Sequence, residues 1–139
     1  MLATMGPMLL ASRSSASEPA MRGVFVIMAT PYTAAKAVDF EDLAGEVRFL
    51  DKCGAHGMVW PQLASEYSQL TTEERMHGME VLAAAAKGRR PALVLGVQGP
   101  NTEAALAYAR HAEKLAPDGL IAMPPADATP RRGPPPKAR

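Results

Sequence analysis

The 139-residue chain carries 15 Lys and Arg residues against 14 Asp and Glu residues, and 47% of its residues are apolar. This composition excludes a wholly disordered chain, and the near-neutral charge gives no general reason to expect a nucleic-acid partner. The length suits one domain, and the single cysteine, Cys53, excludes an intramolecular disulfide.

Residues 1–22 are expected to form a leader outside the folded domain. Residues 1–11 are apolar with a break at Gly6 and Pro7, and residues 13–20 are rich in Ser and Ala. Because the basic segment that opens a secretion signal is missing, we interpret the leader as a disordered start in a cytoplasmic protein. The alternative is the remnant of an export signal. No apolar run is long enough to span a bilayer, so no membrane association is expected.

Between residues 23 and 125, four apolar runs alternate with three segments of helical periodicity. The expected strands are Val24–Ala29, Gly57–Trp60, Pro91–Val97 and Gly119–Met123. The expected helices are Asp39–Cys53, Thr71–Lys87 and Asn101–Leu115. Such alternation predicts parallel strands joined by crossover helices, and the near-continuous apolar strands are typical of a parallel sheet.

The expected helices carry end signals. Asp39 and Asn101 stand where an N-cap residue is expected, and Gly54 follows the first helix as a C-terminal stop. Thr71 and Glu74 match a capping box, in which each side chain accepts a hydrogen bond from the other residue's backbone N–H.

Residues 126–139 form an expected disordered tail. The segment is rich in proline, which fits neither a helix nor a central strand. Its last nine residues hold four basic side chains, so the body of the chain is mildly acidic. A basic docking peptide is the alternative. The change of composition after Thr129 favours a truncation or a shifted reading frame.

Length and periodicity leave the architecture open. An eight-stranded barrel usually needs about 250 residues, whereas only four strands are expected here. On length alone, an open doubly wound sheet of flavodoxin type is the better match.

Three stretches in register resemble the dihydrodipicolinate synthase / N-acetylneuraminate lyase family of class I aldolases. They are residues Ala29–Tyr32 with Val38–Asp39, Glu66 with Leu70–Arg75, and Leu95–Val97 with Asn101–Ala104 and Asp118–Pro125. The resemblance covers residues 23–125. It implies an α/β fold, a partial TIM (β/α)8 barrel made of about the first four strands and three helices.

The resemblance also implies a chemistry. Members of the family join pyruvate to an aldehyde, or reverse that reaction, through a Schiff base on a lysine, with a tyrosine relaying protons. Both residues belong to later strands, which this sequence does not contain. None of its five lysines follows an expected strand, so no catalytic residue is assigned and the chain alone is expected to be inactive. The implied partner is a small 2-oxo acid such as pyruvate, and a full-length form is expected to be a homo-oligomer.

The family's Gly-Thr-Thr-Gly-Glu loop aligns with residues 62–66, where Leu63 and Ala64 replace the two threonines. Neither side chain can hydrogen-bond a carboxylate. Ser65, Glu66 and Thr30 are the candidate substrate-binding residues, and a plain loop or turn role is the alternative for each. Gln62 or backbone N–H groups are further candidates for the lost donors.

Other residues are given structural roles. We interpret Arg75 as part of an ion pair on a helix surface, Cys53 as a buried thiol, and Trp60 as a pocket wall or as packing under a helix. The three histidines lack metal-ligand spacing, and neither a metal nor a cofactor is expected. Two other functions stay open: a non-catalytic binding or assembly module built from a half-barrel, and an open α/β sheet that binds a small acid.

Overall fold

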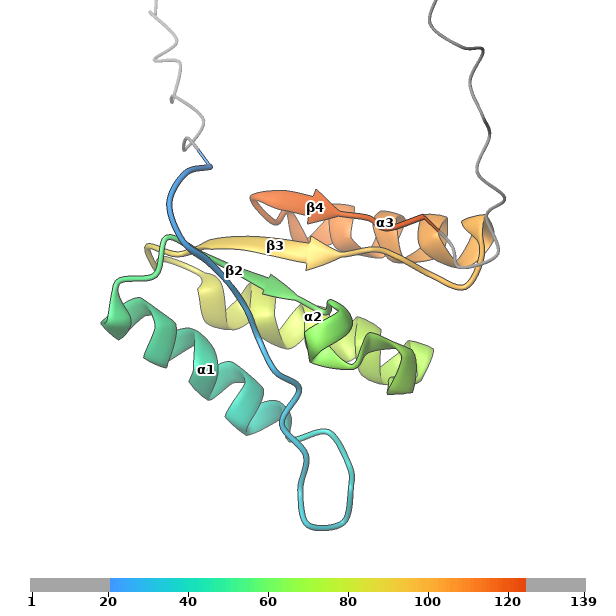
Figure 1. Ribbon diagram of the computed structural model, residues 1–139, viewed down its shortest axis with the longest axis horizontal. Helices are drawn as coiled ribbons and strands as arrows, with labels where there is room; N and C mark the ends of the chain where they lie inside the picture. The colour runs from blue at the N-terminus through green and yellow to red at the C-terminus, as the bar shows by residue number, and fades with distance from the viewer. Residues whose placement is uncertain (1–20, 125–139) are drawn as a thin grey trace, which may run out of the picture.

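A four-stranded parallel sheet with three α-helices on one of its faces forms the body of the protein (Figure 1). The computed structural model describes residues 21–124. Almost all of the expected leader, residues 1–20 of 1–22, and the whole expected tail, residues 126–139, lie outside the described residues.

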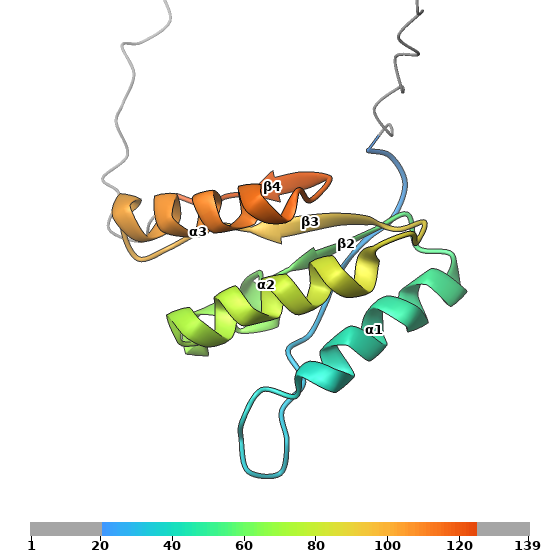
Figure 2. The same ribbon diagram turned by 180° about the vertical axis from the view of Figure 1, so that it is seen from behind.

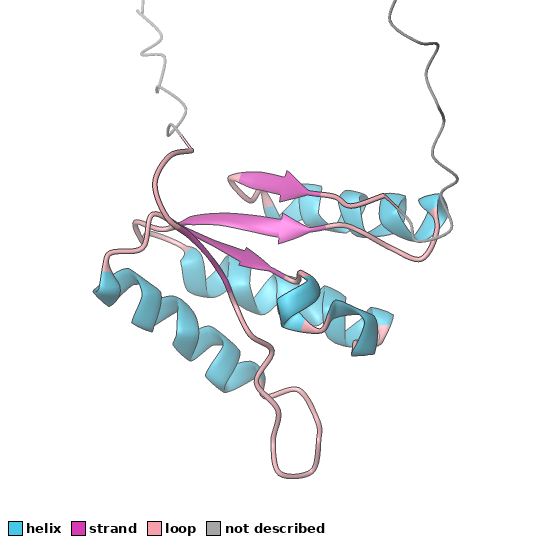
Figure 3. Ribbon diagram, viewed as in Figure 1, coloured by secondary structure: helices cyan, strands magenta, loops and turns pink. Residues whose placement is uncertain are grey.

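The seven expected elements all form, in the expected order (Figure 3). The strands are β1 (Phe25–Ile27), β2 (Gly57–Trp60), β3 (Ala92–Gly96) and β4 (Gly119–Ile121). The helices are α1 (Phe40–Cys53), α2 (Thr72–Ala86) and α3 (Thr102–Leu115), with two short 3-10 turns, η1 (Leu63–Ser65) and η2 (Tyr67–Gln69), between β2 and α2. The edge strands β1 and β4 are shorter than predicted because each has a hydrogen-bonded neighbour on one side only.

The predicted helix ends are confirmed. The side chains of Asp39 and Asn101 each accept a hydrogen bond from the backbone N–H three residues later. Thr71 and Glu74 form the reciprocal capping box, and Gly54 ends α1 in the left-handed conformation. These caps satisfy backbone N–H groups that the first turn of a helix leaves without partners.

Strand order decides between the two architectures that the length left open. The order is β1-β2-β3-β4, and every neighbouring pair is parallel. Because crossovers between parallel strands are right-handed, a strictly sequential order puts all helices on the same face. Figure 2 shows α1, α2 and α3 together in front of the sheet. A doubly wound sheet reverses its order and carries helices on both faces, so that alternative is wrong and the sheet is an arc of a barrel.

The core lies between the sheet and the helices. Its buried residues are Met28, Leu43, Val47, Leu50, Met58, Trp60, Met79, Leu82, Leu93, Leu95, Val97, Tyr108 and Ala112. Trp60 is fully buried and packs against Gly78 of α2, where an added Cβ would lie 2.3 Å from the indole ring. The prediction that Trp60 packs under a helix is therefore confirmed. None of the helices in residues 21–124 has the length and apolar character needed to cross a membrane.

Alternate residues of each strand point to the other side of the sheet, here called the open face. Phe25, Ile27, Val59, Val94 and Ile121 lie on it, since their strand neighbours face the helices. In the arc of a barrel this face is the interior.

Candidate functional site

The segment Gln62–Glu66 follows β2 at the carboxyl end of the sheet, where the loops of a barrel carry its chemistry. It is held in shape from within, because the Ser65 hydroxyl accepts a hydrogen bond from the Gln62 backbone N–H at 3.0 Å. Glu66 closes the turn at φ 55°, a left-handed conformation. The short loop is therefore an ordered 3-10 turn.

Ser65 is fully buried, and its hydroxyl is engaged twice. Besides accepting from Gln62, it donates a hydrogen bond to the Met28 carbonyl oxygen at the end of β1. The structure thus places this predicted substrate donor between the loop and the neighbouring strand. Its hydroxyl ties the two together.

Thr30, the second predicted site residue, lies beside Ser65. Its hydroxyl donates to the Ser65 carbonyl oxygen at 2.6 Å and accepts from the indole N–H of Trp60 at 3.0 Å. Thr30 is 9% exposed, whereas Trp60 and Ser65 are completely buried. The three side chains form one polar cluster that fixes the position of the loop.

Glu66, the third predicted site residue, lies apart from this cluster and is exposed. It lines a cavity of about 430 Å³ together with Tyr32, Lys36, Gln69 and Glu74. Burial raises the pKa of the Tyr32 hydroxyl, and the carboxylates of Glu66 and Glu74 raise it further. Glu66 therefore contributes negative charge to the outer rim of the carboxyl end.

The two residues that replace the family's threonines are exposed on the loop. Leu63 is 70% exposed, and Ala64 is exposed beside it. The loop thus presents an aliphatic surface where the resemblance implies two hydroxyl groups.

Sequence reasoning missed Gln98. This residue follows β3, is 1% exposed, and donates from its amide nitrogen to the Pro61 carbonyl oxygen at 2.7 Å. Its amide oxygen accepts from the side chain of Gln62 at 3.2 Å. A Cβ added to Gly96 on the open face would meet both amides and lie 2.0 Å from the Pro61 oxygen. The two glutamines therefore occupy the barrel interior directly below the loop.

Arg75 is not on the helix surface, so the prediction of a surface ion pair is wrong. It is 2% exposed, and its guanidinium donates to the Gly96 carbonyl oxygen at 2.8 Å. The group lies 4.0 Å from the ring centroid of Tyr108 and 5.5 Å from that of Tyr67. Burial lowers the pKa of Arg75, while Tyr108 acts in the opposite direction. Arg75 thus connects α2 to β3 beneath the loop.

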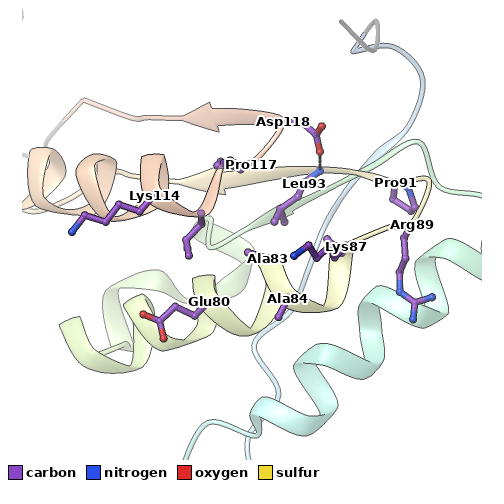
Figure 4. Close-up of a pocket in the computed structure, with 14 residues that line it drawn as sticks. Glu80, Ala83, Ala84, Lys87, Arg89, Pro91, Leu93, Lys114, Pro117 and Asp118 are labelled. Carbon is purple, nitrogen blue, oxygen red and sulfur yellow. Dashed lines mark hydrogen bonds between the residues drawn. The ribbon is translucent and has the colours of Figure 1, made fainter. Parts of the chain in front are cut away.

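No lysine in residues 21–124 lies in this interior. Lys36 is on the exposed turn between β1 and α1, and Lys52 is in the last turn of α1. Lys87 and Lys114 line a cavity of about 650 Å³ with Glu80 and Asp118. Figure 4 shows this cavity between α2 and α3, where the Asp118 carboxylate accepts from the Leu93 N–H at 2.8 Å, at the amino end of the sheet.

Residues 21–124 also hold no group of three His, Cys, Asp or Glu side chains that fits a metal ion. The buried polar groups at the carboxyl end are instead hydroxyls, amides and one guanidinium. Such groups orient a loop or bind a polar ligand by hydrogen bonds.

The sequential arc and its ordered loop after β2 agree with the comparison to protein families. The model of the dihydrodipicolinate synthetase family matches residues 20–128. The chain belongs to this family. The resemblance stated from the three sequence stretches is thereby confirmed, and so is the partial TIM-barrel fold.

Individual relatives agree with this assignment. The 4-hydroxy-tetrahydrodipicolinate synthase of Rhizobium meliloti is 32% identical over 104 residues, which are 75% of this chain and 35% of that protein. Dihydrodipicolinate synthase from Aquifex aeolicus is 27% identical with a TM-score of 0.68, covering 72% of this chain and 33% of that one. An Escherichia coli K12 prophage protein of the same family, solved in complex with pyruvate, is 24% identical with a TM-score of 0.71 over 76% of this chain and 35% of that one. The chain therefore spans about a third of the length of the relatives it matches.

Proposed function

We propose that this chain forms the first half of the barrel of a pyruvate-dependent carbon–carbon lyase. The observation that carries the proposal is the four-stranded sequential arc with an ordered loop after β2, in a chain that matches the family over residues 20–128. In this function the chain supplies part of the mouth, and the lysine that forms the Schiff base comes from later strands. A cytoplasmic location and a homo-oligomeric full-length form belong to the same proposal.

Each residue at the mouth has a role in this proposal. Thr30 and Ser65 are positioning residues, because their hydroxyls are engaged with the loop and with β1. Gln62 and Gln98 form the floor under the substrate. Since Leu63 and Ala64 offer no hydroxyl, the carboxylate of the 2-oxo acid is held by backbone N–H groups of the loop or by the Gln62 amide.

The 139-residue chain alone is proposed to form no Schiff base. The lysines of residues 21–124 lie on an exposed turn, on a helix end or at the amino end of the sheet. A Schiff base needs a lysine that the site keeps deprotonated beside the keto carbon, usually by desolvation. Treatment with pyruvate and borohydride, followed by mass spectrometry, is expected to give no adduct. A pyruvate-derived adduct on any lysine of this chain would contradict the proposal.

A chimera tests the positive part. Residues 23–124 replace the matching first third of the Rhizobium meliloti enzyme, and circular dichroism checks that the product folds. The folded chimera is expected to trap pyruvate on the lysine of its second half. Leu63→Thr with Ala64→Thr in the chimera is expected to increase the trapping rate by restoring two hydroxyls. A folded chimera that traps no pyruvate, with or without these changes, would show that this half does not build a lyase mouth.

A further inference from the structure

Both edges of the sheet lack the features that prevent strand pairing. The edge strands are β1, Phe25–Ile27, and β4, Gly119–Ile121, and each pairs on one side only. Neither contains a proline or a charged residue. Natural proteins usually protect a free edge with such residues, with a bulge or with a covering segment. The described part of the chain thus has two edges that are open to a further strand.

The open face is apolar, and its exposed part lies at these two edges. Ile27 of β1 is 50% exposed and Ile121 of β4 is 38% exposed, whereas Val59 and Val94 on the central strands are each 7% exposed. No charged side chain stands at a strand position on this face. Exposed apolar surface of this kind marks a site of association.

The apolar surface continues around β4 to the helix side. Leu106 and Leu120 are each 49% exposed, and with Ala109 they line a cavity of about 440 Å³ between α3 and β4. The β4 edge is therefore flanked by apolar side chains on both faces, as expected for a strand that lies between two others.

We propose that two copies of this chain associate edge to edge and close an eight-stranded barrel. In this dimer, β1 of one copy lies beside β4 of the other, at both seams. A two-fold axis along the barrel axis relates the copies, so every strand stays parallel and both Gln62–Glu66 loops lie at the same mouth. The inference rests on the fold alone and is independent of the proposed lyase function.

A second copy fits this surface better than an unrelated partner. It supplies four parallel strands, and eight strands give a barrel whose interior side chains just fill. The two faces that meet are both uncharged, so no charge is buried without a partner. A two-fold arrangement also closes on itself and leaves no free edge, whereas a head-to-tail arrangement that does not close grows into filaments.

Sedimentation equilibrium of the 139-residue chain tests the proposal. The expected species is a dimer of twice the 14.7 kDa chain mass. Ile27→Lys and Ile121→Lys are each expected to weaken the dimer by at least about tenfold, because each places a charge in the closed interior. Ala84→Lys on the exposed side of the central helix α2 is the matched control and is expected to leave the dimer unchanged. A monomer, or oligomers that keep growing with concentration, would overturn the proposal.

Hydrogen exchange of the unaltered chain supplies a readout that does not depend on the variants folding. Backbone amides of β1 and β4 are expected to gain protection with protein concentration, in step with dimer formation, while those of the central strand β2 do not change. If β1 and β4 are protected in a monomer, residues of the same chain cover the edges, and the second copy is excluded. If they stay unprotected in a dimer, a different surface holds the copies together and the proposal is wrong.

Discussion

Thr30→Val is the sharpest test of the polar cluster under the loop. Valine has nearly the volume of threonine, so the change removes the hydroxyl without opening a cavity. The hydroxyl accepts from the Trp60 indole N–H at 3.0 Å and donates to the Ser65 carbonyl at 2.6 Å. Since Trp60 is fully buried, no water replaces the lost acceptor.

The two losses set the magnitude. An indole N–H left buried without a partner costs about 1–3 kcal/mol, and the hydrogen bond to Ser65 contributes about 0.5–1.5 kcal/mol. We therefore expect Thr30→Val to lower the free energy of unfolding by about 2–4 kcal/mol. The single tryptophan, Trp60, lies within the cluster, so its fluorescence during urea unfolding reports on the same region.

Thr33→Val is the matched control for this experiment. Thr33 is exposed, and its hydroxyl accepts one hydrogen bond from the Ala37 N–H at 3.3 Å. Exposed changes of this kind usually stay within about 0.5 kcal/mol. The assignment of Thr30 as a positioning residue is refuted if both variants unfold at the same urea concentration.

Three further outcomes are expected. Gly96→Ala, whose Cβ would lie 2.0 Å from the Pro61 oxygen, is expected to cost about 1–3 kcal/mol in urea unfolding, whereas Gly45→Ala, with no atom closer than 3.5 Å, is expected to stabilise α1 by about 1 kcal/mol. Burial raises the pKa of Glu46, so its ionised form destabilises the fold above that pKa. Glu46→Gln is therefore expected to raise the urea midpoint at neutral pH, and this gain should vanish as the pH falls through the folded and then the unfolded pKa. Cys53 is exposed, so it is expected to react with a thiol reagent in the folded protein as fast as in urea; strong protection would contradict the structure.

Local signals predicted the elements well. The bounds of β2 agree with the prediction, and the helix starts follow from Asp39, Thr71 and Asn101, each of which caps its own helix. Capping depends on residues three positions apart, and strands depend on short apolar runs. A sequence displays both directly. The choice of a barrel needed the family resemblance, because periodicity does not fix strand order.

Side-chain environments were predicted less well. The spacing of Arg75, Gly78, Met79 and Leu82 is that of a buried helix stripe, and it was the signal that Arg75 faces the core. Cys53 was predicted to be buried, yet it lies about a quarter turn from the buried face of α1. Contacts that join distant segments were not accessible at all. The bond between Gln62 and Gln98 connects residues 36 positions apart and has no local pattern.

The sequential strand order also has a kinetic consequence. Each strand pairs with the next one along the chain, and the paired residues are only about 25 to 35 positions apart. Closing loops of similar, moderate length carries a similar entropic penalty at each step. The sheet can therefore grow one strand–helix unit at a time from the amino end, as the polypeptide leaves the ribosome, with each finished unit serving as the template for the next.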